Sequence, residues 1–329
     1  MPDDGERSEL LLPGPAQALA GLLDVPVPDL DDGLPLLWHW IYLLDRPAQA
    51  DLGPDGHPVR GTIPAPPEPG QRRMWAGGRV STAGPLRCGQ PATRRSQVLH
   101  VEQKAGRSGP LTFVTIGHQI WQHDRVVVDE QQDIVYRQAA AAPPPQPAAS
   151  QPASPARSQE AVPAADGEWA IAVSPVLLFR FSALTYNAHR IHYDRDYARD
   201  VEGYPGLLTH GPLQALAMAE AARAAGYPAG QSTAGGLTFQ YRLESPLFDH
   251  QGMIVEAVRE ERDTITTAVC DVYGRQTARG TLTRAGSANE SRLRRPSTMP
   301  MPMPIEFAID NTSPMAIAQY RELPHKFAY

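Results

Sequence analysis

A run rich in alanine, proline, serine and glutamine occupies residues 138–168, near the middle of the 329-residue chain. It holds almost no side chains that could pack into a core, and its composition is typical of a solvated linker. It separates an N-terminal part from a C-terminal part. We predict an N-terminal unit over residues 8–137, a C-terminal unit over residues 169–285, and a tail over residues 286–329, where methionines and prolines alternate.

Strand-like segments recur in both units, with the valine, isoleucine, threonine and aromatic content of antiparallel sheets. The predicted strands are residues 96–103, 109–123, 125–137, 237–243, 252–261, 264–273 and 277–284. Residues 38–40 (Trp-His-Trp) are predicted to form a further strand with aromatic faces. Ala-Gly-Gly occurs at 76–78 and at 234–236, each expected before a strand, and Pro-Leu follows both copies at similar offsets. This echo predicts two copies of one unit in tandem.

One helix stands out in the C-terminal unit. Gly211 and Pro212 are expected to open it, LQALAMAEAARAA fills it, and Gly226 with Pro228 closes it. Its residues are small and apolar nearly all round, which indicates a helix surrounded by other structure. A helix wrapped by a curved antiparallel sheet is the hotdog arrangement, and the N-terminal unit shows no equally good counterpart. The predicted fold is α+β: a double hotdog whose central helix is best formed in the second unit.

Charge and cysteine content exclude several classes of function. The chain has 30 basic and 36 acidic side chains, and this net charge of -6 argues against nucleic acid or an anionic membrane as a partner. The N-terminus lacks a secretory signal, and the apolar stretch 34–44 is shorter than the roughly 20 residues of a membrane helix. Cys88 and Cys270 are too few for a disulfide framework and are given no role. We predict a cytoplasmic protein.

The densest polar cluster lies in residues 181–194 (FSALTYNAHRIHYD), just before the predicted helix. It resembles a motif that MaoC-type hydratases and dehydratases carry at this place, of the form D-x-N-P-x-H. Aligned on that motif, the chain has Asn187 at the family's Asp, His189 at its Asn, Arg190 at its Pro and His192 at its His. The segment GLLTHGPL, which ends at the predicted helix start, resembles the family's A-H-G-M-L.

The variant T-Y-N-x-H-R-I-H-Y-D resembles the hydroxyacyl-thioester dehydratase type 2 branch and the related mesaconyl-CoA and itaconyl-CoA hydratases. N-terminal segments that also resemble this branch are residues 35–42, 52–60, 72–78, 106–114 and 130–137. The resemblance covers roughly residues 8–285. It implies a double hotdog with one active site, located in the C-terminal half.

The residues at this place can perform the implied chemistry. Adding water across a 2,3-unsaturated thioester needs a donor to the thioester oxygen, a base for the water and an acid for the α carbon. The helix start at Gly211 can supply N–H donors, and His192 can act as base and then as acid, because imidazole titrates near neutral pH. Asn187 cannot take a proton but can hold the water or fix the histidine tautomer. His189 is a candidate for the remaining role.

Arg72, Arg73 and Arg190 are candidates for binding CoA phosphates or a substrate carboxylate, since guanidinium pairs well with both. The alternative for each is a solvated surface arginine. Tyr186 and His210 are predicted with them as substrate-binding residues.

The histidines of the polar cluster could also form a metal site, in which Asp194 would join His189 and His192. These three lack a fourth ligand nearby, so no metal is predicted. Asp194 is expected instead to cap a short helix.

We therefore predict a hydro-lyase of the (R)-specific enoyl-thioester type that acts on a small-molecule acyl-CoA and needs no cofactor. A C5 dicarboxylic acyl group such as mesaconyl or itaconyl is the favoured substrate. Two alternatives stay open: a 3-hydroxyacyl-thioester dehydratase of fatty-acid synthesis, and a thioester-binding module without turnover, because Asn187 replaces the family carboxylate. The sequence allows a homodimer.

Overall fold

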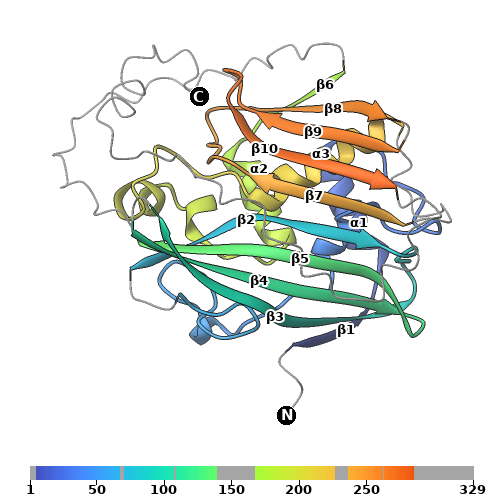
Figure 1. The fold of residues 1–329 in the computed structure, drawn as a ribbon, viewed down its shortest axis with the longest axis horizontal. Coiled ribbons are helices and arrows are strands. Elements are labelled where there is room, and N and C mark those ends of the chain that lie inside the picture. Colours follow the sequence, from blue (N-terminus) through green and yellow to red (C-terminus); the bar gives the residue numbers. More distant parts are fainter. Residues whose placement is uncertain are drawn as a thin grey trace.

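The computed structural model describes residues 5–66, 70–106, 109–138, 167–226, 236–261 and 263–284. In these ranges ten strands form one antiparallel sheet (Figure 1). The first half contributes β1 (Glu6–Leu10), β2 (Gln71–Thr82), β3 (Pro91–Gly106), β4 (Gly109–Gln122) and β5 (Arg125–Gln138). The second half contributes β6 (Glu168–Ile171), β7 (Leu237–Leu243), β8 (Met253–Glu261), β9 (Thr264–Cys270) and β10 (Gln276–Arg284).

Read from the outer edge of the sheet to its middle, the two halves have corresponding strand orders. The order is β1-β3-β4-β5-β2 in the first half and β6-β8-β9-β10-β7 in the second. They meet where β2 pairs with β7, and Gly77 and Gly78 lie in that contact opposite Arg242 and Tyr241. A Cβ on Gly77 would lie 2.5 Å from the Tyr241 carbonyl oxygen, so this crossing requires glycine. The sheet is continuous and the fold is a double hotdog, as predicted. The first Ala-Gly-Gly, however, lies inside a strand rather than before one, and Ala234 and Gly235 lie outside the described residues.

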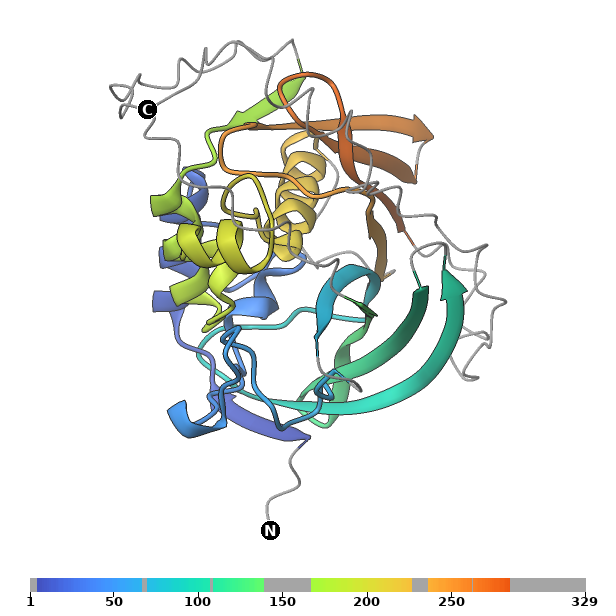
Figure 2. The same cartoon turned by 90° about the vertical axis from the view of Figure 1, so that its left-hand side faces the viewer.

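The central helix of the second half is α3 (Gly211–Ala224), which lies on the concave side of the sheet (Figure 2). Its residues from Leu213 to Ala222 are all buried, which agrees with the small, apolar sequence. Gly226 follows with a φ of 76°, and Pro228 lies outside the described residues. The prediction of a buried helix in this half is confirmed.

The predicted strands are present, with one exception. Trp38–Ile41 forms a 3-10 helix, η1, instead of a strand. Leu37, with a φ of 68°, turns the chain into η1, and indole N–H groups hold the helix there. Trp38 Nε1 donates to Glu220 on α3 and Trp40 Nε1 donates to Glu130 on β5, each over 2.8 Å. Distant polar partners thus override the local strand preference of the aromatic residues.

The remaining helices are α1 (Pro13–Leu23), α2 (Pro175–Leu184), η2 (Gln49–Asp51), η3 (Arg190–His192) and η4 (Tyr197–Val201). We did not predict α1, although Pro13 at its start and apolar side chains at helical spacing are signals in the sequence. The helix ends at Asp24, which has the left-handed conformation. No helix of the described ranges is long and apolar enough to span a membrane. Most of the predicted linker and the whole of the predicted tail lie outside the described residues, and Cys88 and Cys270 are free thiols.

Candidate active site at the junction of the two halves

A cavity of about 520 Å³ opens where the two halves meet. The N-terminal half lines it with a loop that includes His57 and with Arg73 and Trp75 of β2. The C-terminal half lines it with the turn before η3 and with the start of α3. Its members that were predicted as site residues are Asn187, His189, His192 and Gly211. The structure therefore brings together the predicted catalytic residues and one of the three predicted arginines.

His192 is held as a neutral base. Its Nδ1 donates to the Leu208 carbonyl oxygen over 2.7 Å, which leaves the Nε2 lone pair free to accept a proton. Burial lowers the pKa of His192 to about 4, although the hydrogen bond to Leu208 opposes this shift. The expectation that this ring titrates near neutral pH is therefore wrong, because the ring is buried and no carboxylate of the described ranges bonds to it. At neutral pH His192 is uncharged.

The His210 ring packs against the His192 ring. The two rings are stacked with centroids 3.6 Å apart and planes 19° apart. His210 is fully buried, its Nε2 lies 2.9 Å from Ser182 Oγ, and it does not belong to the cavity lining. We expected a substrate-binding residue here. The structure instead places this side chain where it fixes the orientation of the His192 ring.

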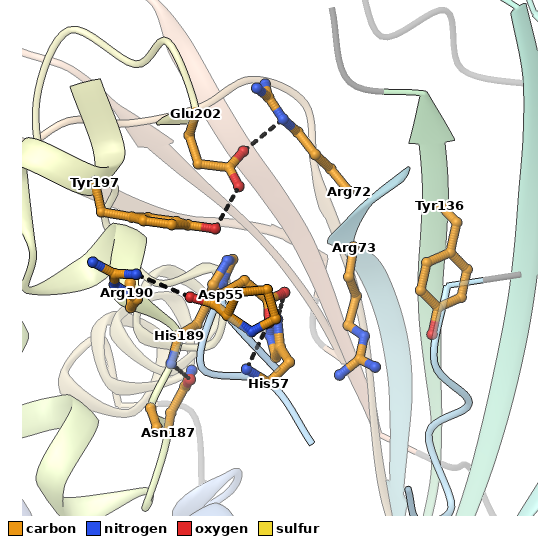
Figure 3. Close-up of polar contacts among 12 residues, drawn as sticks. Asp55, His57, Arg72, Arg73, Tyr136, Asn187, His189, Arg190, Tyr197 and Glu202 are labelled. Atoms are coloured by element: carbon orange, nitrogen blue, oxygen red, sulfur yellow. Dashed lines mark hydrogen bonds and ion pairs between the residues drawn. The ribbon is translucent and has the colours of Figure 1, made fainter. Parts of the chain in front are cut away.

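Asn187 shapes the turn that carries His189. Its Oδ1 accepts a hydrogen bond from the His189 backbone N–H over 2.9 Å (Figure 3). The asparagine therefore does not fix the tautomer of His192, a role that the Leu208 carbonyl takes. The His189 ring lies between two other imidazoles, 3.9 Å from His57 and 5.4 Å from His192 by centroids. Burial, followed by the charges of its neighbours, lowers the pKa of His189 well below its ordinary value.

The start of α3 faces the cavity with Gly211 and Pro212. No acidic side chain occupies the first turn, so the unpaired N–H groups and the positive end of the helix dipole are available to a negative group. Thr209 Oγ1, just before the helix, is buried, lines the cavity and lacks a hydrogen-bond partner in the described ranges. A Cβ on Gly211 would lie 2.2 Å from Leu243 Cδ1, so glycine keeps this approach open.

Two of the candidate arginines are neutralised outside the cavity. Arg72 Nε lies 2.5 Å from a Glu202 carboxylate oxygen (Figure 3). Arg190 binds Asp194 over 2.8 Å and stacks on the Tyr197 ring, 4.0 Å from its centroid. Neither side chain belongs to the cavity lining, so the structure does not bring them to the predicted substrate.

Arg73 differs from both. It lines the cavity, donates to the Pro64 carbonyl oxygen over 3.0 Å and lies over the Tyr136 ring at 5.8 Å. Its Nε is buried without a hydrogen-bond partner, and no carboxylate pairs with it in the described part of the chain. Tyr186, the last predicted binding residue, is 54% exposed and lines an adjoining cavity of about 550 Å³.

We missed Asp55 and His57, which come from the N-terminal half. His57 Nδ1 lies 3.0 Å from Asp55 Oδ2, and the His57 backbone N–H donates to Asp55 Oδ1 over 3.0 Å. Both residues fall in a segment that resembles the hydratase branch, and Asp-Gly is a turn signal, but neither observation assigns them chemistry. Their proximity to His189 is a tertiary fact.

Asp55, His57 and His189 are the group in the described ranges whose ligand atoms lie close enough, within 4.8 Å, to consider a metal ion. Asp55 is already hydrogen-bonded to His57 through both oxygens. The Asp55 carboxylate is thus already engaged by His57, and we assign no metal. Asp194 caps the helical turn at Tyr197 over 3.0 Å, so that prediction is confirmed.

Comparisons with known proteins identify the family of the chain. The family model described as hydroxyacyl-thioester dehydratase type 2 matches residues 37–249. A mesaconyl-C(4)-CoA hydratase of Chloroflexus aurantiacus is 48% identical over 236 residues, which make up 71% of this chain and 79% of that protein. The mitochondrial hydroxyacyl-thioester dehydratase type 2 of Schizosaccharomyces pombe is 41% identical over 83 residues, 25% of this chain and 27% of that protein.

Solved structures show the same fold at much lower identity. HtdX of Mycobacterium tuberculosis matches with a TM-score of 0.55 at 14% identity, over 84% of this chain and 98% of that chain. A MaoC-like dehydratase of Phytophthora capsici matches with a TM-score of 0.55 at 14% identity, over 86% of this chain and 96% of that chain. With the family model and the 48% identical relative, these findings show that the chain belongs to the hydroxyacyl-thioester dehydratase type 2 family of MaoC-like double-hotdog hydratases and dehydratases.

Proposed function

We propose that this protein is a hydro-lyase that adds water to, or removes it from, the 2,3-double bond of an enoyl-CoA. The favoured substrate has a C5 dicarboxylic acyl group such as mesaconyl or itaconyl. The 48% identical mesaconyl-C(4)-CoA hydratase supports this reaction. The observation that carries the substrate assignment is Arg73, a cation that lines the cavity without a carboxylate partner in the described ranges.

An enclosed cation is costly unless it is paired. Arg72 and Arg190 have carboxylates of their own, so neither needs a ligand to balance its charge. Arg73 has a carbonyl oxygen and an aromatic face, and within the described ranges no carboxylate forms an ion pair with it, although the charge of Asp55 acts on it from a distance. A second carboxylate on the acyl group would supply the missing charge, and guanidinium binds carboxylate through paired hydrogen bonds.

The other side chains fit the chemistry at the thioester. The N–H groups at the start of α3 would bind the thioester oxygen as enolate charge develops, where fixed donors act most strongly. His192 Nε2 would take a proton from water as the water oxygen bonds to the β carbon. Because Leu208 holds the His192 ring in one tautomer, the accepting nitrogen is available at neutral pH.

We further propose that the protein works in the cytoplasm and needs no cofactor, since water, CoA thioester and side chains suffice for these steps. A homodimer stays a prediction. The family name keeps a 3-hydroxyacyl-thioester dehydratase of fatty-acid synthesis as the second candidate. Arg73 argues against it, because an alkyl chain would leave the guanidinium unpaired.

The test is the replacement of Arg73 by Met, with Arg79→Met as the matched control. Arg79 lies on the same strand and is exposed. Hydration is followed by loss of enoyl absorbance on mesaconyl-CoA, on crotonyl-CoA and on the same acyl groups carried by acyl-carrier protein. We expect R73M to lose at least about tenfold more kcat/KM on mesaconyl-CoA than on crotonyl-CoA, because it leaves a carboxylate unpaired. Equal losses, or a preference for crotonyl on carrier protein, would favour the fatty-acid dehydratase.

A further inference from the structure

The loop of the N-terminal half that reaches the cavity is closed on itself. Leu52 and Pro58 pair across it, and Gly53 N–H donates to the His57 carbonyl oxygen over 2.7 Å. Asp55 and His57 lie at its tip, joined by hydrogen bonds from both the ring and the backbone of His57 to the Asp55 carboxylate. The histidine ring is therefore held by a carboxylate before any substrate arrives.

The tip of this loop docks directly on the turn that carries the predicted catalytic residues. The Arg190 backbone N–H donates to the Asp55 carbonyl oxygen over 2.9 Å. A Cβ on Gly56, which has a φ of 86°, would lie 1.8 Å from the Ala188 carbonyl oxygen, so no larger residue fits there. Asp55 and His57 lie beside His189 and Asn187 (Figure 3). This contact fixes an imidazole of one half against the site of the other.

The reaction needs two positions where a proton can be taken or given. Water loses a proton at the β carbon, and the α carbon gains one. Asn187 cannot exchange a proton, and His192 has a carbonyl oxygen as its ring partner rather than a charge. Of the imidazoles that line the cavity, His57 has a carboxylate hydrogen-bonded to its ring, and its Nε2 has no hydrogen-bond partner within the described residues.

We propose that His57, oriented by Asp55, is the second proton-transfer residue of the site and exchanges the proton of the α carbon, while His192 exchanges the proton of the water. This assignment rests on the proposed hydration reaction. In hydration the water oxygen bonds to Cβ and its proton goes to His192 Nε2. The electron pair of the double bond moves into the enolate, and a proton from His57 Nε2 forms the Cα–H bond. The proton on His192 then returns to His57, and the His189 ring between them is placed to pass it.

The charged groups around His57 come from three elements. Asp55 lies on its own loop, Arg73 faces it from β2, and His189 and His192 face it from the C-terminal half. Burial lowers the pKa of His57, Asp55 opposes this and Arg73 adds to it. Hydration uses protonated His57, whereas removal of an α proton uses the neutral ring. As the pH rises through the pKa of His57, the rate of hydration should therefore fall and the rate of α-proton removal should rise.

The experiment compares His57→Asn with His192→Ala, and uses His123→Asn as the matched control. Asn at position 57 keeps a donor for Asp55 but has no atom that can exchange a proton. His123 is exposed, outside the cavity, and its φ of 50° suits asparagine. Two rates are measured: hydration of crotonyl-CoA, and exchange of the α protons of butyryl-CoA with D2O, read by proton NMR. The second reaction needs no water addition.

We expect H57N to lose at least about a hundredfold in both rates, the lower range for removing an acid-base group. H192A should lose hydration to a similar extent but keep α-proton exchange within about tenfold. In the wild type, exchange should rise with pH through the His57 pKa while hydration falls. Asp55→Asn should move the exchange limb to lower pH, because it removes the charge that raises the pKa of His57, and a merely structural role would not move it.

Each other outcome overturns the assignment. If the wild type hydrates crotonyl-CoA and H57N stays within about threefold of it, His57 is not a proton carrier. If H192A loses α-proton exchange as severely as H57N does, His57 has no separate role and a single histidine performs both proton transfers. Wild-type activity that requires added Zn²⁺ would make the cluster a metal site. A wild type that hydrates no enoyl-CoA would instead remove the proposed function itself.

Discussion

The two halves share one strand order but fill their sheets differently. In the C-terminal half a regular helix, α3, occupies the concave face, and its N-terminus points at the cavity. In the N-terminal half a short 3-10 helix, η1, and connecting loops take that place beside the cavity of about 550 Å³. A helix satisfies its own backbone, whereas loops leave polar groups that need partners. The N-terminal half therefore buries polar side chains such as His39, Glu130 and Gln132 at this place, whereas most of the buried residues of α3 are apolar.

In the N-terminal half, Glu130 is the hydrogen-bond partner of several buried polar groups. Its carboxylate accepts hydrogen bonds from His39, Trp40 and Gln132 over 2.9, 2.8 and 2.7 Å. Burial raises the pKa of Glu130, but the hydrogen bond and charge of His39 outweigh this and lower the pKa to about 2. A single buried carboxylate thus anchors η1 to the sheet, the task that apolar packing performs for α3.

Among the substitutions that test this comparison, Glu130→Gln is expected to change the free energy of unfolding most. Removing this buried carboxylate leaves the donors that face it without a charged acceptor, which costs about 1–3 kcal/mol of unfolding free energy. The lowered pKa means that the wild-type contribution is complete above the ordinary glutamate pKa of about 4.3 and is lost as the pH falls toward 2. Urea titrations from pH 7 to pH 2 should therefore show a smaller pH slope in the variant.

Asp129→Asn, the exposed neighbour on β5, is the control and should stay within about 0.5 kcal/mol of the wild type. Equal stability of E130Q and the control at pH 7 would mean that η1 is held by packing alone. The two halves would then be stabilised in the same way.

The difference between the halves also explains what sequence could predict. The strands and α3 follow from local patterns of apolar residues, and the motif around His192 predicts which turn carries the proposed catalytic residues. Trp38 has the local preference of a strand, and its true conformation depends on Glu220, far along the chain. Nothing local ranks Arg73 above Arg190, because the ranking rests on which guanidinium has a carboxylate beside it.

A smaller effect is expected in the C-terminal half from Asn187. Replacement by Ala removes the acceptor for the His189 N–H and should lower kcat by roughly tenfold, since positioning is lost while the proton carriers remain. Replacement by Asp keeps an acceptor for the His189 N–H, so if position 187 only positions this turn, N187D should hydrate no faster than the wild type. The measurement is kcat against pH for both variants.

Faster hydration by N187D at neutral pH, with an unmoved pH profile, would contradict this expectation. The site would then be a weakened form of the family's Asp and His pair. The N-terminal half would not need to supply a second proton carrier.

The central claim is that a neutral His192 at the junction of the halves drives hydration of a dicarboxylic enoyl-CoA. The direct measurement is the rate of loss of enoyl absorbance of mesaconyl-CoA with the wild type and with His192→Ala, with folding of both checked by thermal unfolding. We predict steady turnover by the wild type and at least about a hundredfold lower kcat in the variant. A folded variant that keeps its rate, or a folded wild type that leaves mesaconyl-CoA unchanged, would contradict it.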